Sequence, residues 1–189
     1  MGADRIPVSA LCTARLVLRP IQLSDAEAIQ RLFSRWEIVR QLHAPWPFPH
    51  DGALNFCRDV LAAAERGENW TWTLRLKSAP ADLIGAISLR LNDVENRAFW
   101  IGLSWQGQGL MSEASAATMD FWFRTLRRDV FRVSKAAENA ASRRISESAG
   151  MRVIGTKIGD YASGPLLTEI WEITREEWDA RRTQDKSSR

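Results

Sequence analysis

A short turn containing two glycines has residue types and spacing that suggest chemistry. Residues 105–114 read Trp-Gln-Gly-Gln-Gly-Leu-Met-Ser-Glu-Ala, after an apolar run and before a long helical pattern. N–H groups at a helix start lack intrahelical partners and can donate to an anion. Gly107 and Gly109 let the backbone approach a phosphate without a Cβ in the way. Ser112 and Glu113 suit the first helical turn. The pattern predicts a phosphate site, although an ordinary strand-to-helix turn has similar residues.

A dinucleotide-binding turn is an alternative for these glycines. Its fingerprint needs a third glycine, where this chain has Ser112, and an acidic residue about 20 positions later. Asp129 lies at a tolerable distance but follows Arg127 and Arg128 in a basic segment. The turn also lies past the middle of the chain, whereas a dinucleotide turn usually opens its domain. These departures argue against that interpretation.

A second informative segment spans residues 138–151. Asn139 is a good helix N-cap, and Gly150 stands where a left-handed residue ends a helix. An ordinary capped helix explains the segment when it is considered alone.

Together the two segments resemble the GNAT superfamily of acyl-CoA N-acyltransferases, which carries Gln/Arg-x-x-Gly-x-Gly/Ala at this turn. Here Met111 replaces the final small residue. The wider run resembles the RimJ/RimL-like branch, as does the opening at residues 15–20. The residues that carry the resemblance are Phe99-Trp100, Gln106-Gly107-Gln108-Gly109-Leu110-Met111, Ser112-Glu113-Ala114, Asn139 and Ser142.

The resemblance implies a single α/β domain over residues 13–178, with an N-terminal extension (1–12) and a charged, disordered tail (179–189). Its mixed, mostly antiparallel sheet is flanked by helices and splays between the strand ending near Leu103 and the strand starting near Phe131. Acetyl-CoA would lie in the splay as co-substrate, and no metal is expected. The implied contacts are Ile101 and Leu103 for the pantetheine amides, Gln106, Gly107, Gln108, Gly109, Leu110 and Met111 for the pyrophosphate, and Asn139 and Ser142 for the pantetheine arm.

The catalytic groups are less clear from the residues. Many GNAT proteins use a tyrosine as the general acid, and the spacing places Ser146 at that position in this chain. Ser142 or Ser146 would then protonate the leaving thiolate, or the thiolate would leave without a proton donor. Glu95, or nearby Asp93, would relay a proton unless these are solvated turn residues.

The loop over residues 43–51 contains three prolines, which exclude helix and sheet. Trp46 and Phe48 are expected to form the acceptor wall, with the alternative that they plug the core. His43 and His50 are weaker candidates for a base.

The expected reaction is acetyl transfer to a primary amine by direct attack in a ternary complex, with a protein N-terminal α-amine as the expected acceptor. Small amines such as antibiotics or polyamines are an alternative, as is a catalytically idle acyl-CoA-binding regulatory domain. An RNA-associated module fits less well, because no aromatic RNA motif accompanies the arginines.

The elements that must position these residues follow from periodicity. Residues 13–21 read as a strand, and Ser24 with Glu27 as a helix-opening capping box. Residues 51–66 form a helix. Residues 70–77 alternate with period two, which predicts a half-buried strand in a hairpin with residues 83–91. Strands over residues 97–103, 131–137, 151–157 and 166–174 complete the sheet.

Composition limits the protein class. The chain has 189 residues, 45% hydrophobic content and a net charge of +3, which fits one globular domain and does not favour nucleic acid. No apolar run reaches the ~18 residues of a membrane span, and no signal peptide is evident. Two cysteines without metal spacing suggest free thiols in the cytoplasm. We expect a cytoplasmic monomer or homodimer.

Overall fold

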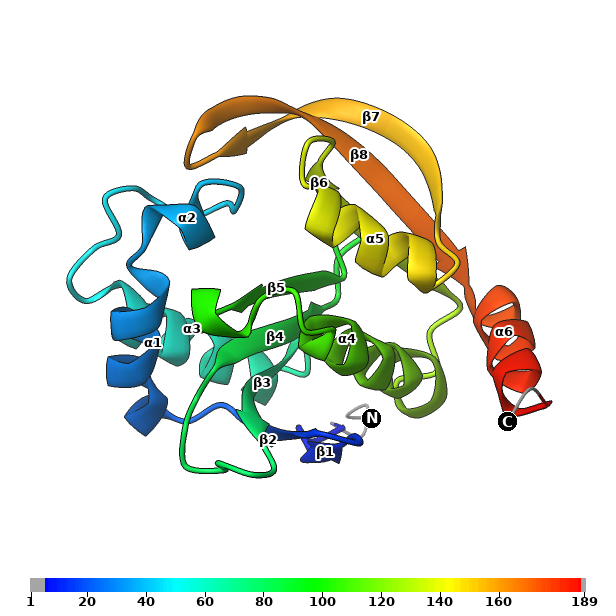
Figure 1. Ribbon diagram of the computed structural model, residues 1–189, viewed down its shortest axis with the longest axis horizontal. Helices are drawn as coiled ribbons and strands as arrows, with labels where there is room; N and C mark the ends of the chain where they lie inside the picture. The colour runs from blue at the N-terminus through cyan, green and yellow to red at the C-terminus, as the bar shows by residue number, and fades with distance from the viewer. Residues whose placement is uncertain (1–5, 188–189) are drawn as a thin grey trace.

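The fold consists of two antiparallel sheets set side by side, with helices on both sides of the first (Figure 1). It comes from a computed structural model that describes the backbone of residues 6–187 and the side chains of residues 6–183. The first sheet has the strand order β1-β2-β3-β4-β5 and the second the order β6-β8-β7. The strands are β1 (Leu11–Cys12), β2 (Leu16–Pro20), β3 (Asn69–Leu76), β4 (Gly85–Arg90), β5 (Arg97–Ile101), β6 (Val130–Ala136), β7 (Arg152–Tyr161) and β8 (Gly164–Thr174).

Helices separate the strands along the chain. The α-helices are α1 (Ala26–Phe33), α2 (Trp36–Val39), α3 (Gly52–Glu65), α4 (Leu110–Asp120), α5 (Ala140–Ser148) and α6 (Arg175–Ser187). Two 3-10 turns, η1 (Leu23–Asp25) and η2 (Leu103–Trp105), and a π-helical turn, η3 (Phe121–Thr125), complete the set. The predicted α/β class with mostly antiparallel sheets is confirmed.

The two sheets separate between β5 and β6, as the family resemblance implied. Neighbouring residues at the start of the two strands are bonded, because the Asn96 amide donates to the Arg132 carbonyl and the Arg132 amide donates to Asn96 Oδ1, both at 2.7 Å. Beyond this point the two strands belong to different sheets. The gap opens from the Asn96–Arg132 contact.

The long hairpin of β7 and β8 arches over the gap toward α2 (Figure 1). Its register shifts between Val153 and Gly155, and a bulge of this kind bends a strand. The hairpin tip therefore reaches the first half of the chain instead of continuing straight past α5.

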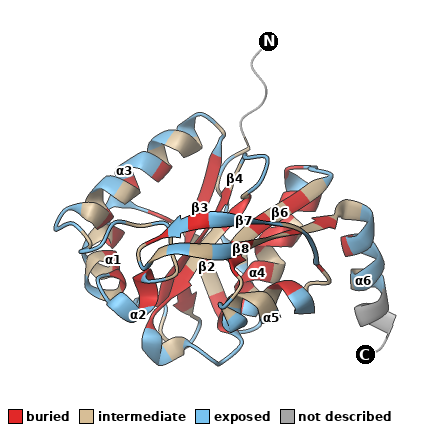
Figure 2. Ribbon diagram, turned by 90° about the horizontal axis from the view of Figure 1, so that it is seen from above, coloured by how far each residue is buried: buried red, intermediate tan, exposed pale blue. Residues whose placement is uncertain are grey.

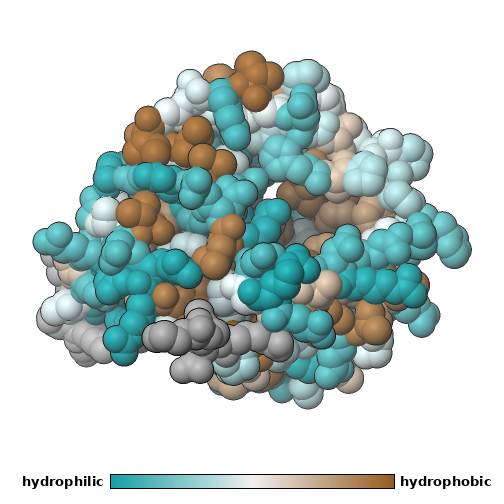
Figure 3. All heavy atoms as spheres, turned by 180° about the vertical axis from the view of Figure 1, so that it is seen from behind, coloured by the Kyte–Doolittle hydropathy of each residue, from teal (hydrophilic) through white to brown (hydrophobic). Residues whose placement is uncertain are grey.

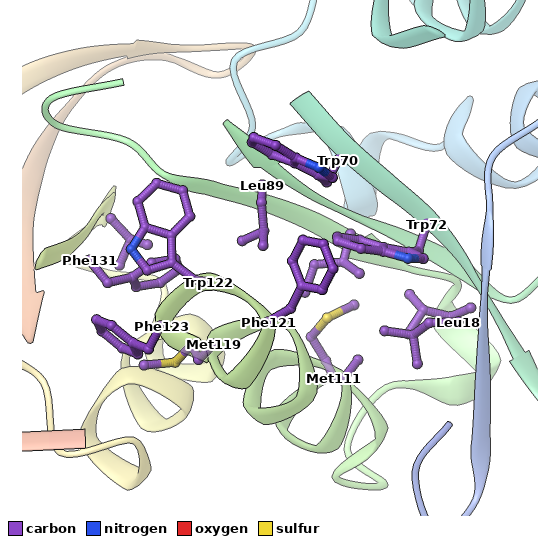
Figure 4. Packing of buried hydrophobic residues seen from close by; sticks show 14 of the residues in the cluster. Leu18, Trp70, Trp72, Leu89, Met111, Met119, Phe121, Trp122, Phe123 and Phe131 are labelled. Carbon is purple, nitrogen blue, oxygen red and sulfur yellow. The ribbon is translucent and has the colours of Figure 1, made fainter. Parts of the chain in front are cut away.

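Aromatic side chains fill the larger core, between the first sheet, α4 and β6. Phe121 points from the π-helical turn toward Trp72, with ring centroids 5.2 Å apart, and Trp122 packs edge-on against Phe131 at 5.4 Å (Figure 4). A smaller core forms between α1, α3 and the opposite face of the sheet. Figure 2 shows the buried residues concentrated in strands such as β3 and β4, whereas β7, β8 and the outer faces of the helices are mostly exposed or intermediate.

The expectation of a half-buried strand at residues 70–77 was wrong. Every residue from Asn69 to Arg75 is buried, because α3 packs on β3 and Phe121 of the π-helical turn packs on Trp70 and Trp72. Its polar side chains find partners inside: Thr71 Oγ1 bonds Asn69 and Ser88. Alternation of polar and apolar residues indicates exposure only where one face meets water.

A buried carboxylate at the start of α1 links the helix to the sheet. Asp25 is 3% exposed, accepts from Arg75 Nη2 at 2.8 Å, and pairs also with Arg19. Its second oxygen accepts from the Gln22 amide at 2.8 Å. The predicted capping box of Ser24 and Glu27 was therefore displaced by one built on Asp25, and Glu27 is exposed.

The C-terminal helix extends further than predicted. α6 continues to Ser187, where the sequence led us to expect disorder after Trp178. Trp178 is 4% exposed and donates from Nε1 to Asp120, which also pairs with Arg182 at 2.7 Å. These contacts hold the helix against α4. Residues 188–189 lie outside the described part.

The Asp25 contacts lead to a stability prediction. Asp25→Asn removes the charge that compensates two arginines, one of them buried, and should lower the free energy of unfolding by about 3 kcal/mol in urea denaturation. The matched control Glu27→Gln changes an exposed carboxylate on the same helix and should stay within about 0.5 kcal/mol of wild type. Equal effects of the two substitutions would contradict the assignment.

Candidate functional site

The glycine turn has the geometry of an anion cradle. Gly107 and Gly109 both have φ of +74°, and Gly109 caps α4. Within residues 6–187, the amides of residues 107–112 have no hydrogen-bond partner. A Cβ at Gly107 would meet nothing within 4 Å, so the turn is open on that side. The loop thus presents free N–H groups at a helix start, which fits a diphosphate.

Glu113 fastens this turn to the beginning of the first sheet. It accepts from the Arg15 amide at 2.7 Å, from Arg15 Nε at 2.8 Å, and from Thr13 Oγ1. Burial raises the pKa of this carboxyl, but the bonds from Thr13 and Arg15 outweigh it and leave the pKa below its ordinary value. Arg15 Nη1 also donates to the Gln108 carbonyl at 3.0 Å, which fixes the loop.

The edge of β5 that faces away from β4 offers unpaired backbone to a ligand. The Gly102 amide bonds the Ile84 carbonyl, so by alternation Phe99 and Ile101 direct their backbone groups to the opposite edge. The Ile101 carbonyl there accepts from Gln106 Nε2 at 3.2 Å. The predicted strand to residue 103 ends at Ile101, and Leu103 lies in η2 with 39% of its surface exposed. Leu103 is therefore not on this edge.

A cavity of about 590 Å³ passes through the gap between the two sheets. It reaches residues on both faces of β5, for example Phe99 and Trp100, and residues of β6. The molecule is visibly hollowed near its centre when seen from behind (Figure 3). Of the predicted site residues, the cavity is lined by Phe48, Glu95, Asn139, Ser142 and the candidate base His43, but not by Ile101 or residues 106–111.

Asn139 and Ser142 lie together at the start of α5. Asn139 Oδ1 accepts from the Ser142 amide at 3.0 Å and so caps the helix as predicted. The Ser142 side chain is half-buried at the cavity wall. The cap leaves its hydroxyl group free to meet a ligand.

Ser146, the other predicted catalytic serine, is fully buried and does not line the cavity. Its Oγ accepts a 2.6 Å bond from Lys135 Nζ, and Lys135 does line the cavity. Burial first, and then the Arg97 charge, lower the pKa of Lys135 to about 6. Sequence reasoning missed this lysine, because a single lysine in a β-strand gives no signal of its surroundings.

The hairpin tip covers the cavity and contributes the chain's only tyrosine. The Ala162 and Ser163 amides donate to the carbonyls of Leu42 and Arg40, at 3.0 and 3.1 Å. Tyr161 lines the cavity, bonds Thr168 Oγ1 at 2.9 Å and stacks on His43 at 4.5 Å. Burial, together with the Glu95 charge, raises the pKa of Tyr161, so its hydroxyl stays protonated near neutral pH. No local pattern around Tyr161 indicated that this residue, far along the chain, reaches the site.

Glu95 enters the cavity from the turn before β5. It is half-buried, and its carboxylate has no hydrogen-bond partner in the described part of the chain. Asp93 is exposed and does not line the cavity. An unengaged carboxylate in a largely apolar cavity is suited to accept a proton from an amine.

The two aromatic residues of the proline-rich loop lie in different surroundings. Phe48 lines the cavity and packs on Phe33 with ring centroids 4.8 Å apart, so it is both cavity wall and core. Trp46 does not line the cavity; it is 42% exposed and lies 5.3 Å from Trp36. His50 is exposed and also outside the lining.

The described residues contain neither a cluster of metal-ligand side chains nor a helix that could cross a membrane. No group of three or more His, Cys, Asp or Glu side chains in them could hold a metal ion. None of their helices combines the length and the apolar character that crossing a membrane requires.

Comparison with known proteins agrees with this geometry. Residues 15–152 match the family model described as an acetyltransferase (GNAT) domain. No curated protein sequence matches the chain.

Solved structures with the same fold include RimJ of Mycobacterium smegmatis in complex with a CoA disulfide. It has a TM-score of 0.74 and 18% identity over 89% of this chain and 88% of that one. The RimL ribosomal alpha-N-protein acetyltransferase with coenzyme A has a TM-score of 0.72 and 20% identity, covering 89% and 97%. The microcin C7 self-immunity acetyltransferase MccE with acetyl-CoA and AMP has a TM-score of 0.75 and 15% identity, covering 90% and 98%. At these identities the likeness shows the fold.

The glycine turn leads to a binding prediction. Gly109→Glu places a negative side chain and a strained left-handed residue in the cradle, so the Kd for coenzyme A in calorimetry should rise at least about ten-fold, or about 1.4 kcal/mol. Gly67→Glu is the matched control, because Gly67 also has positive φ (+73°) and open surroundings but ends α3. The control should lose stability and keep its affinity; unchanged affinity in Gly109→Glu would refute the cradle.

Proposed function

Because the chain belongs to the GNAT family of acetyltransferases, it is an acetyl-CoA-dependent N-acetyltransferase, and we propose that its acceptor is the α-amine of a protein or peptide. The observation that carries the proposal is the cavity between β5 and β6. It joins the free edge of β5 and the start of α5 to the unengaged carboxylate of Glu95. Donor and acceptor can therefore meet in one chamber.

The donor side consists of backbone and short polar side chains. The amides of residues 107–112 would hold the diphosphate of acetyl-CoA, and the edges of Phe99 and Ile101 would pair with its pantetheine amides. Asn139 and Ser142 would lie beside the pantetheine arm. When bound, acetyl-CoA supplies the activated acetyl group. Fixed amide donors need no reorganisation on binding.

The acceptor side must deliver a neutral amine. An α-amino group has an ordinary pKa of about 7.7–8.0, whereas a lysine has about 10.4, so the α-amine needs less help. We assign Glu95 as the group that takes its proton, directly or through water. Direct attack in a ternary complex fits a chamber that holds both reactants.

Among the hydroxyl side chains that line the chamber, we consider two as donors to the leaving sulfur. Ser142 projects from the start of α5, and Tyr161 reaches in from the hairpin tip with a raised pKa. We place Ser142 in this role, since Tyr161 is already bonded to Thr168. Ser146 holds Lys135 and does not reach the chamber.

A small-molecule amine is the second candidate acceptor. The hairpin tip covers the cavity, and a volume of about 590 Å³ lies within the range of about 300–1,000 Å³ for small-ligand sites. The similar structures include both a ribosomal alpha-N-protein acetyltransferase and a self-immunity acetyltransferase. We further propose that the enzyme works in the cytoplasm, where Cys12 and Cys57 stay free.

An acceptor panel separates the two candidates. Thiol release from acetyl-CoA should be observed with peptides that have a free α-amine, and it should disappear when the α-amine is formylated although a lysine remains. Polyamines and aminoglycosides serve as the small-amine arm. Turnover confined to that arm would replace the proposal with the second candidate, and binding of coenzyme A without any turnover would favour an idle binding domain.

The role of Glu95 predicts a selective catalytic defect. Glu95→Gln removes the proton acceptor and should lower kcat by roughly 10²–10⁴-fold on the best peptide while the Kd for coenzyme A stays unchanged. Asp93→Asn, an exposed carboxylate in the same turn, is the control and should keep wild-type kcat. A wild-type rate in Glu95→Gln across the pH range would remove Glu95 from the mechanism.

A further inference from the structure

Lys135 differs in its surroundings from the other lysines whose side chains the structure describes. It lies on β6 with 5% of its surface exposed and lines the cavity. Lys77 and Lys157 are exposed. One primary amine of the protein is thus held inside the chamber where acetyl groups are transferred to primary amines.

No carboxylate neutralises this amine. Lys135 has no ion pair within residues 6–183, and Nζ instead donates to Ser146 Oγ and lies 4.7 Å from the centre of the Trp171 ring. Arg97, itself 4% exposed, faces it from β5. Glu169 on β8 attracts it but is bonded to Arg143 at 3.2 Å and to the Trp171 indole. A buried ammonium without a partner is unfavourable.

The charges around Lys135 decide its protonation state. Burial, then Arg97, and more weakly Arg143, favour the neutral amine, while Glu169 and Glu147 oppose them. The resulting pKa of about 6 leaves the amine mostly uncharged at neutral pH. A neutral amine is the nucleophile that the proposed reaction uses.

Lys135 lines the same cavity as residues to which we assign the donor. The lining of that cavity also includes Phe99 on the free edge of β5 and Ser142 at the start of α5, the helix whose Ser146 bonds Nζ. These are residues to which we assign the pantetheine arm.

We propose that Lys135 is a site of self-acetylation, which takes the acetyl group from bound acetyl-CoA when no acceptor occupies the chamber. The inference rests on the proposed function. The lone pair of Nζ attacks the thioester carbonyl carbon, the C–N bond forms, and the C–S bond breaks with its electron pair leaving on sulfur. Nζ loses one proton and the sulfur gains one, so the products are acetyl-lysine and the free thiol of coenzyme A.

The modification would limit the enzyme's own activity. An amide is not an acetyl donor to another amine under these conditions, so the acetyl group stays on Lys135. It would add bulk between β6 and α5 and remove the amine that bonds Ser146. We therefore expect transfer activity to decline as Lys135 is acetylated.

The test uses the wild-type protein with acetyl-CoA alone, followed by intact mass and peptide mapping. We expect a gain of about 42 Da on Lys135, with Lys77 and Lys157 unmodified as internal controls. Because the pKa is lowered, the rate should be nearly constant above about pH 7 and fall as the pH drops below about 6. Lys135→Arg should remain unmodified and still bind coenzyme A in calorimetry.

Each outcome of this experiment supports or contradicts self-acetylation of Lys135. If wild-type protein binds coenzyme A but Lys135 stays unmodified, the inference fails and the proposed function stands. If Lys77 and Lys157 are acetylated as fast as Lys135, the labelling is ordinary solution chemistry and the inference also fails. If coenzyme A does not bind, the proposed function fails together with it.

Discussion

β5 and β6 lie next to each other but belong to separate sheets, and the rest of the structure depends on this missing strand pairing. Unpaired strand edges inside a protein are unfavourable, because buried backbone groups need partners. Here the Asn96–Arg132 contact holds the two strands together at one end. β6 pairs with β8 of the arching hairpin and so belongs to the second sheet. A ligand with amide groups can hydrogen-bond to the unpaired strand edges in such an opening, and the pantetheine of acetyl-CoA has amide groups.

Buried charges near this gap lower the stability of the fold, and the apolar core beside the gap compensates for them. Arg97 and Lys135 are buried in it without a carboxylate partner in the described residues, and the Arg97 Nε atom makes no hydrogen bond. Burial lowers the pKa of Arg97 to about 10. The aromatic core around Trp72, Phe121 and Phe131 lies directly beside them and supplies large buried apolar area. Conflicts between local chemistry and packing are expected at functional sites.

How much the sequence predicts depends on how far each contact reaches along the chain. The glycine turn, the Asn139 cap and the strand sequence are local, and the structure has them at the predicted places. Lys135 and Tyr161 could not be identified as site residues, because their positions follow from the split sheet and from a hairpin bent by a bulge. Trp46 shows the opposite error: an aromatic residue in a rigid loop suggested a binding wall, yet its neighbour Phe48 turns inward and it turns outward. The burial of β3 on both faces could be known only once α3 and the π-helical turn were placed.

Two main-chain hydrogen bonds join the cover over the chamber to the α2 side, beside the contacts that His43 makes with Tyr161 and the Asp160 carbonyl. Ala162 and Ser163 donate their peptide N–H groups to the peptide oxygens of Leu42 and Arg40, and no side chain takes part in these two bonds. Side chains of these segments other than His43 and Tyr161 can therefore change while the two main-chain bonds keep the cover in place. A family with this junction can change its acceptor by changing the side chains that line the cover, while the main-chain hydrogen bonds that hold the cover stay the same.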